Sequence, residues 1–181
     1  MNSRVLVIKA ENCTGCHLCE LACSSAKEGQ FVPMRSRIKV VTDGLKGWSN
    51  PLVCVHCKEP LCLKVCPVDA IFKSETAHGD KIIDINREKC IACHHCVVAC
   101  PFGAIEYIKD VGIVKCDLCG GNPICVEFCF YDCLGFIELT EEQYQKRASK
   151  VSALTVKACR TISKKEPSYR RKMISRDLSK I

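Results

Sequence analysis

The sequence has no long hydrophobic run and few aromatic residues. Aromatic side chains make up 6% of its 181 residues, and the 48% counted as hydrophobic includes 18 cysteines. Without those cysteines about 38% of the chain is apolar, which is little for a domain core of this size. The absence of about 18 consecutive apolar residues argues against membrane insertion, and the frequent Val, Ile and Leu argue against disorder. We therefore expect the cysteines to hold something that fills part of the interior.

The N-terminal residues do not predict a secretory leader. The apolar run at residues 5–8 is too short for the core of a signal peptide, and no small-residue cleavage site follows it before Cys13. The pair Arg170-Arg171 lies at the wrong end for a twin-arginine signal. We expect a cytoplasmic protein with reduced thiols, unless a partner subunit carries an export signal for both chains. In that compartment clustered cysteines are more often metal ligands than disulfide partners.

Motifs for organic cofactors are absent. Gly120-Gly121 followed by Asn122-Pro123 predicts a turn, and no phosphate loop of the G-x4-G-K-[ST] type occurs. The chain shows no flavin or nicotinamide motif and no catalytic acid–base pair. We therefore predict a protein without a catalytic site of its own.

Sixteen of the cysteines fall into four groups of four, here called quartets. They are Cys13, Cys16, Cys19 and Cys23; Cys54, Cys57, Cys62 and Cys66; Cys90, Cys93, Cys96 and Cys100; and Cys116, Cys119, Cys125 and Cys129. The first and third have the spacing C-x2-C-x2-C-x3-C, and the second and fourth lengthen the middle gap to four and five residues. Proline follows the last cysteine of the second and third quartets, so the pattern is an internal repeat with variable linkers.

The spacing within a quartet predicts iron–sulfur clusters. Three closely spaced thiolates can wrap around one compact cluster, whereas the last two cysteines of each quartet are four positions apart. On a helix such residues share a face but are offset by about 6 Å along the axis, so the fourth thiol leans towards a second cluster. Bacterial two-cluster ferredoxins follow this rule. The alternative metal is structural zinc, which usually takes two separated C-x2-C pairs; the repeated quartets instead predict four [4Fe-4S] clusters.

Two longer strings carry a family resemblance. They are CVHCKEPLC at residues 54–62 and KCDLCGGNPIC at residues 115–125. With the quartets, they make residues 4–137 resemble the four-cluster ferredoxin-like electron-transfer subunits of multi-subunit oxidoreductases. Members of that family serve molybdenum or tungsten enzymes of the dimethyl sulfoxide reductase and formate dehydrogenase types, nickel–iron hydrogenases and carbon monoxide dehydrogenase.

The resemblance implies an α+β fold of two bacterial-ferredoxin-like units related by a pseudo-two-fold axis, each with short β-hairpins, helices and two clusters. Residues 1–30 and 110–139 would form the first unit, and residues 53–109 the second. Residues 31–52 would connect them, and residues 140–181 would form a basic C-terminal helix and tail.

The resemblance also implies that the quartets exchange their last cysteines, the first with the fourth and the second with the third. The four ligand sets would be Cys13, Cys16, Cys19 and Cys129; Cys116, Cys119, Cys125 and Cys23; Cys54, Cys57, Cys62 and Cys100; and Cys90, Cys93, Cys96 and Cys66. Ser24 and Phe130 stand where a ferredoxin often has proline. Cys133, four residues after Cys129, is an alternative ligand in the first set.

We accordingly expect an electron relay rather than an enzyme. The chain would pass single electrons between a large catalytic subunit and an external partner, such as a ferredoxin or a flavin-containing subunit. On resemblance, the catalytic subunit would be a tungsten or molybdenum enzyme, such as an aldehyde oxidoreductase or a tungsten subunit of an aromatic-ring reductase. A hydrogenase, carbon monoxide dehydrogenase or formate dehydrogenase is an alternative. Two other classes stay open: a free polyferredoxin, and a structural or nucleic-acid-binding cluster protein.

Other residues receive structural interpretations. His17, His56, His94 and His95 are expected in loops between ligands, with the alternative that an imidazole N–H raises a cluster potential. Cys159 is expected in a helix without a partner. Short strands are predicted at Arg4–Ala10, Lys81–Ile85, Ala104–Ile108 and Gly112–Val114, a connecting loop at residues 28–52, and a helix start at the capping box Thr140-Glu141-Glu142-Gln143.

Charge is divided unevenly along the chain. Residues 1–145 hold 15 Lys and Arg against 18 Asp and Glu, whereas residues 146–181 hold 12 against 2. Such a tail can indicate nucleic-acid binding. However, four clusters with their thiolates would add about eight negative charges and bring the net charge from +7 to about −1. We therefore expect the tail to bind an acidic partner subunit or its own acidic body, or to stay solvated, and expect no nucleic-acid partner.

Overall fold

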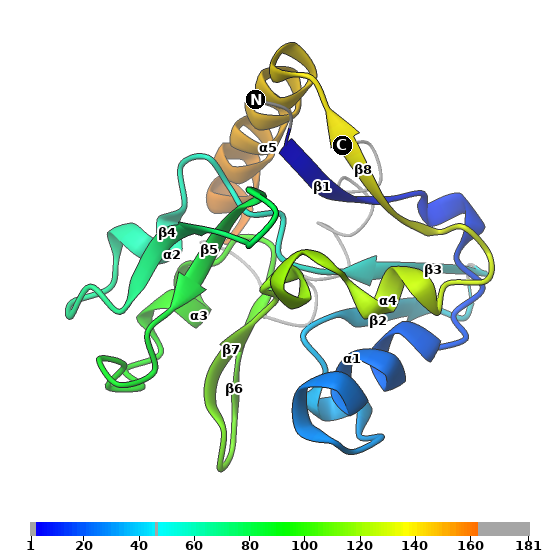
Figure 1. Ribbon diagram of the computed structural model, residues 1–181, viewed down its shortest axis with the longest axis horizontal. Helices are drawn as coiled ribbons and strands as arrows, with labels where there is room; N and C mark the ends of the chain where they lie inside the picture. The colour runs from blue at the N-terminus through cyan, green and yellow to red at the C-terminus, as the bar shows by residue number, and fades with distance from the viewer. Residues whose placement is uncertain (1–2, 46, 163–181) are drawn as a thin grey trace.

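The chain forms short helices and four separate two-stranded sheets, an α+β architecture (Figure 1). This computed structural model describes residues 3–45 and 47–162. The helices are α1 (Leu18–Glu28), α2 (Leu61–Lys64), α3 (His95–Ala99), α4 (Ile124–Glu127) and α5 (Glu141–Ile162), with 3-10 turns at Ala10–Asn12, Pro33–Arg35 and Leu118–Gly121. The strands are β1 (Ser3–Ile8), β2 (Lys39–Asp43), β3 (Trp48–Leu52), β4 (Ile71–Glu75), β5 (Lys81–Ile85), β6 (Ile105–Ile108), β7 (Gly112–Lys115) and β8 (Leu134–Leu139).

All four sheets are antiparallel pairs. Three are hairpins, β2–β3, β4–β5 and β6–β7. The fourth joins two strands that lie far apart in the sequence, because β1 pairs with β8 and places Ser3 opposite Leu139. This pairing brings the first quartet, which follows β1, close to the fourth quartet, which precedes β8.

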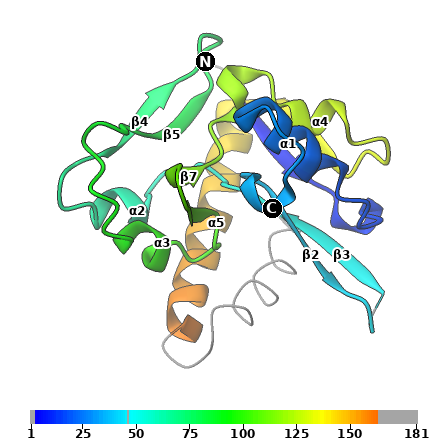
Figure 2. The same cartoon turned by 90° about the horizontal axis from the view of Figure 1, so that it is seen from below.

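The helices that carry cysteines pack in two pairs. Helix α1 contacts α4, and α2 contacts α3. Figures 1 and 2 show α2, α3, β4 and β5 on one side of the molecule and α1, α4, β2 and β3 on the other, with β7 between them. The first quartet therefore lies beside the fourth, and the second beside the third.

The predicted strands are found, but others were missed. Strand β5 has the predicted bounds, and β1, β6 and β7 lie at the predicted places. The prediction of a loop at residues 28–52 is wrong, because this stretch contains the β2–β3 hairpin. Two β-branched residues, Val40 and Val41, favour a strand there, and Pro51 is tolerated because a two-stranded sheet has only edge strands.

Only α1 contains both final cysteines of its quartet, Cys19 and Cys23. The helices α2, α3 and α4 end before the last cysteine. In the second and third quartets the cause is the proline that follows, since it disfavours helical backbone in the residue before it. The expected helical offset of the fourth thiol thus holds for the first quartet, whereas turns place the other three.

Helix α5 begins at the predicted capping box. The Gln143 amide N donates to Thr140 Oγ1 at 3.3 Å, and the Thr140 amide N donates to Gln143 Oε1 at 2.9 Å. Further along α5, Val151 is buried in an apolar cluster with Leu52, Val55 and Phe102. Helix α5 is thereby fixed against the body of the protein. The side chain of Cys159 and the tail at residues 163–181 lie outside the described residues.

No helix in the described part of the chain is both long and apolar enough to cross a bilayer.

Thr140→Ala removes the hydroxyl that caps α5. Loss of such a cap costs about 1 kcal/mol, so amides in the first turn of α5 should exchange with solvent about fivefold faster. Hydrogen exchange followed by mass spectrometry measures the effect. Ser152→Ala, an exposed change in the middle of the same helix, is the control and should leave the first turn unchanged. Equal exchange in Thr140→Ala and wild type would contradict a capping role.

Candidate metal centres

The last cysteine of the second quartet meets the third quartet in one cavity. Cys66, Cys90, Cys93 and Cys96 line it together with apolar residues that include Ile71. Cys93 is exposed, whereas Cys96 is buried. The structure thus brings together the four cysteines of one predicted ligand set.

A second cavity combines the first and fourth quartets. It is lined by Cys13, Cys16, Cys19, Cys129 and Cys133. Cys129 and Cys133 both reach it, so the geometry leaves both available as the fourth ligand. Cys16 is the exposed member of this group.

The thiols of Cys54, Cys57, Cys62 and Cys100 also converge. Cys54, Cys57 and Cys100 pack against the same apolar cluster as Val151 of α5. Burial raises the pKa of Cys57, and the neighbouring thiols of Cys54, Cys100 and Cys62 raise it further. Burial raises the pKa of Cys62 to about 12, again with Cys54 and Cys100 as neighbours.

The remaining group is the most deeply buried. Cys23, Cys116 and Cys125 lie in one core cluster, with Cys119 close by. Burial raises the pKa of Cys125, and Cys116, Cys23 and Cys119 raise it further. Burial also raises the pKa of Cys116, with Cys54 as its strongest thiol neighbour. This group therefore lies next to the group of Cys54.

The last cysteine of each quartet lies among backbone N–H donors. The amides of Arg37, Ala70 and Leu134 donate to the Sγ atoms of Cys23, Cys66 and Cys129 at 3.3, 3.2 and 3.3 Å. Burial raises the pKa of Cys100 to about 11, opposed by amides of residues 102–104. Such donors stabilise thiolate sulfur and tune iron–sulfur clusters.

Three histidines occupy the predicted loop positions. His17, His56 and His94 have φ values of 61°, 47° and 65°, in the left-handed region. Histidine is among the residues enriched in that region. His17 Nδ1 lies 2.8 Å from a Glu20 carboxylate oxygen, and the His94 ring stacks on Tyr107 at 4.6 Å. The structural interpretation therefore accounts for His17 and His94.

Cys13 and Cys133 share a hydrogen bond. It lowers the pKa of Cys13 and raises that of Cys133. The thiolate is the form that binds metal. The Cys129 sulfur accepts a hydrogen bond from the Leu134 amide at 3.3 Å.

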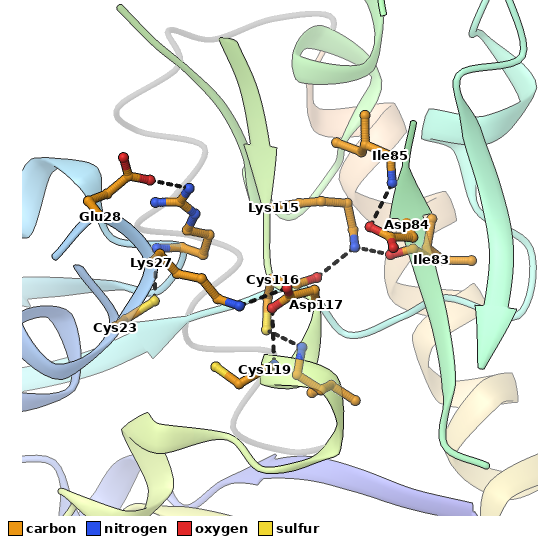
Figure 3. A network of polar contacts seen from close by, with 12 residues as sticks. Cys23, Lys27, Glu28, Ile83, Asp84, Ile85, Lys115, Cys116, Asp117 and Cys119 are labelled. Atoms are coloured by element: carbon orange, nitrogen blue, oxygen red, sulfur yellow. Dashed lines mark hydrogen bonds and ion pairs between the residues drawn. The ribbon is translucent and has the colours of Figure 1, made fainter. Parts of the chain in front are cut away.

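Lysines join the cysteine loops (Figure 3). Lys27 of α1 donates to Asp117 in the fourth quartet at 2.7 Å. Lys115 is buried; its Nζ donates to the Cys116 carbonyl at 2.6 Å and to the Ile83 carbonyl on β5. Lys115 thus bridges the two halves of the molecule. The sequence analysis missed this role, because nothing local marks a lysine as buried.

The thiols of these groups fit iron–sulfur clusters. None of the described cysteines forms a disulfide. Burial and mutual repulsion raise the pKa of eight of the sixteen quartet thiols, so the ionisation of these eight depends on added positive charge, which iron supplies. In the described residues, no three His, Cys, Asp or Glu side chains converge tightly enough for a single metal ion.

Comparison with known families gives matches in two segments. The 4Fe-4S dicluster domain matches residues 53–104, and a 4Fe-4S binding domain matches residues 10–27. The polyferredoxin-like subunit of the aliphatic sulfonate oxidoreductase of Pyrococcus furiosus is 41% identical over 126 residues, which cover 68% of this chain and 70% of the relative. This protein belongs to the 4Fe-4S ferredoxin-like subunits of oxidoreductases.

Other members of this family show similar coverage. The B subunit of the anaerobic dimethyl sulfoxide reductase of Haemophilus influenzae is 36% identical, and the match covers 73% of this chain and 72% of the relative. Among solved structures, the BamBC complex of benzoyl coenzyme A reductase contains a chain that is 28% identical with a TM-score of 0.47, covering 84% of this chain and 91% of that chain. The predictions of an oxidoreductase electron-transfer subunit, of [4Fe-4S] clusters and of a non-catalytic role are confirmed by the family.

Gly121 provides a test of the fourth cysteine loop. Its φ is +106°, and an added Cβ would lie 2.7 Å from His78 Cδ2 and 3.0 Å from Asp80 Oδ2. The Asp80 carboxylate forms an ion pair with Arg4, whose Nη2 lies 2.7 Å from Asp80 Oδ2. Asp80 therefore cannot move away from the added Cβ without disturbing that ion pair. Gly121→Ala should displace the loop between Cys119 and Cys125 and lower reconstituted iron by about four atoms per chain, one cluster.

The matched control is the neighbouring Gly120→Ala. Gly120 also has a positive φ, +71°, but an added Cβ there meets nothing within 4 Å. Iron and acid-labile sulfide are counted after anaerobic reconstitution of both variants. Full iron in Gly121→Ala, or equal losses in the two variants, would show that the close approach to Asp80 does not shape the loop.

Proposed function

We propose that the chain holds four [4Fe-4S] clusters and passes single electrons along them between a catalytic subunit and an external redox partner. The observation that carries the proposal is the grouping of the thiols, in which three cysteines of one quartet meet the last cysteine of another. The proposed ligand sets are Cys13, Cys16, Cys19 and Cys129; Cys116, Cys119, Cys125 and Cys23; Cys54, Cys57, Cys62 and Cys100; and Cys90, Cys93, Cys96 and Cys66. Cys133 remains the alternative to Cys129.

The order of the sets along the molecule follows from their neighbours. The set of Cys54 lies beside that of Cys116, since these two thiols interact. Helix α2 packs against α3, and α1 packs against α4. These two helix pairs support two ferredoxin-like units with two clusters each. The set that contains Cys93 and the set that contains Cys16 then lie at the two ends of the row of clusters. Both of these cysteines are exposed. An exposed ligand at each end suits electron exchange with two partners.

When bound, the clusters supply one-electron chemistry. The residues of this chain fix the clusters in place, exclude water from the two inner sets and donate amide hydrogen bonds to their sulfur ligands. We propose a tungsten or molybdenum oxidoreductase as the catalytic partner and a ferredoxin or flavin-containing subunit as the other. The relation to the sulfonate oxidoreductase and dimethyl sulfoxide reductase subunits supports an oxidoreductase partner. The cytoplasm is the proposed compartment.

Iron counting and spectroscopy test this function. Anaerobically reconstituted protein should contain about sixteen irons per chain, and dithionite reduction should give electron paramagnetic resonance signals with magnetic coupling between clusters. Co-purification of the native protein with a large subunit at fixed stoichiometry would distinguish a subunit from a free polyferredoxin. Clusters that stay oxidised under dithionite would refute electron transfer.

The crossed ligand sets are tested with Cys100→Ser. If Cys100 serves the set of Cys54, its loss should damage that cluster and leave Cys54, Cys57 and Cys62 open to alkylation. Anaerobic iodoacetamide treatment followed by peptide mass spectrometry identifies the labelled thiols.

Cys66→Ser is the matched control for this exchange. It should expose Cys90, Cys93 and Cys96 instead. If Cys100→Ser labelled Cys90, Cys93 and Cys96 while sparing Cys54, each quartet would hold its own cluster and the exchange would be wrong.

A further inference from the structure

We propose that Arg147 of α5 raises the reduction potential of the cluster held by Cys54, Cys57, Cys62 and Cys100, making this inner cluster the one of highest potential. The inference rests on the proposed ligand sets. The proposal assigns a function to helix α5, which lies outside both segments matched by the 4Fe-4S families.

Arg147 reaches the backbone around the first cysteine of this set. Its Nη1 donates to the Val55 carbonyl at 3.3 Å, and its Nη2 donates to the Leu6 carbonyl at 3.4 Å. Arg147, Cys54 and Val55 line one small cavity. The Nε atom of Arg147 is buried and has no hydrogen-bond partner among the described residues.

The charge of Arg147 has no carboxylate partner within the described part of the chain. The cations near other cysteines differ: Lys27 pairs with Asp117 at 2.7 Å, and Arg37 pairs with Glu28 at 2.5 Å. Burial lowers the pKa of Arg147, while Tyr144, Cys57 and Cys54 raise it. Arginine nevertheless stays protonated in proteins. A partly buried cation without a counter-charge is costly, so the negative charge of a bound cluster would compensate the charge of Arg147.

Two further groups add positive potential at this place. Buried Lys115 donates only to the carbonyls of Ile83 and Cys116 in the described structure. Its charge lowers the pKa of both Cys62 and Cys116 against the larger effect of burial, so it serves both inner sets, whereas Arg147 is specific to the set of Cys54. His56 Nδ1 accepts the Ile83 amide, which leaves a hydrogen on Nε2; this buried atom has no described partner.

The end sets lack comparable charges among the residues that the structure describes. The cavity of Cys66, Cys90, Cys93 and Cys96 is lined by His94 and His95 but by no Lys or Arg. The cavity of Cys13, Cys16 and Cys19 is lined by His17, again without Lys or Arg. Reduction adds one negative charge to a cluster, and nearby unpaired positive charge stabilises that form. The potential should therefore peak at the set of Cys54.

Redox titration of the full-length reconstituted protein tests the proposal. We expect Arg147→Met to lower the highest of the cluster potentials and to leave the iron content unchanged. Arg147→Lys, which retains the charge, should keep the potential. Lys150→Met removes an exposed charge one turn further along α5 and should also leave the highest cluster potential unchanged. In a Cys100→Ser background the effect of Arg147→Met should disappear, because the affected cluster is damaged.

The outcomes separate this inference from the proposed function. Unchanged potentials in an iron-replete Arg147→Met variant would overturn the role of Arg147 while leaving the relay intact. If that variant loses iron, Arg147→Gln removes the charge but keeps N–H donors, and the same fall in potential is expected. Loss of iron from both variants with retention in Arg147→Lys would assign Arg147 to holding the site together and overturn a role in tuning.

Discussion

The burial of ligand thiols is the constraint on which this protein depends. Packing four thiols together in the interior raises their pKa values, as at Cys19 and Cys62, where burial is the main cause. Without positive charge such groups stay protonated and only fill space. Because the chain is poor in other apolar residues, we expect iron binding and folding to be coupled.

Strand and helix pairs between segments far apart in the sequence bring these thiols together. The β1–β8 sheet joins the N-terminal strand to the strand that follows the fourth quartet, and α1 packs on α4 where the first and fourth quartets meet. Helix α2 packs on α3 at the second and third quartets. Each helix pair brings the last cysteine of one quartet near the other quartet, so under the proposed exchange each ligand set draws on two segments of the chain.

The positive charges near the proposed ligand sets differ in whether a carboxylate neutralises them. Salt bridges such as Lys27–Asp117 neutralise the cations near the innermost fourth-quartet loop. Lys115 and Arg147 have no carboxylate partner in the described residues; Arg147 lies at the set of Cys54, and Lys115 lies between that set and the set of Cys116. Backbone amides supply the remaining donors, as at Cys23 and Cys66. The same fold can therefore give chemically identical clusters different potentials.

Cysteine spacing was enough to predict iron–sulfur chemistry and sixteen candidate ligands, because the ligands of one loop are local in sequence, and the family resemblance added the electron-transfer role. The capping box at Thr140 and strand β5 could also be predicted, since both depend on near neighbours. Strands β4 and β8, the hairpin inside residues 28–52 and the burial of Lys115 and Arg147 could not. Those features arise from contacts between segments far apart in the chain, such as Arg147 with Val55, and no local pattern encodes which segments meet.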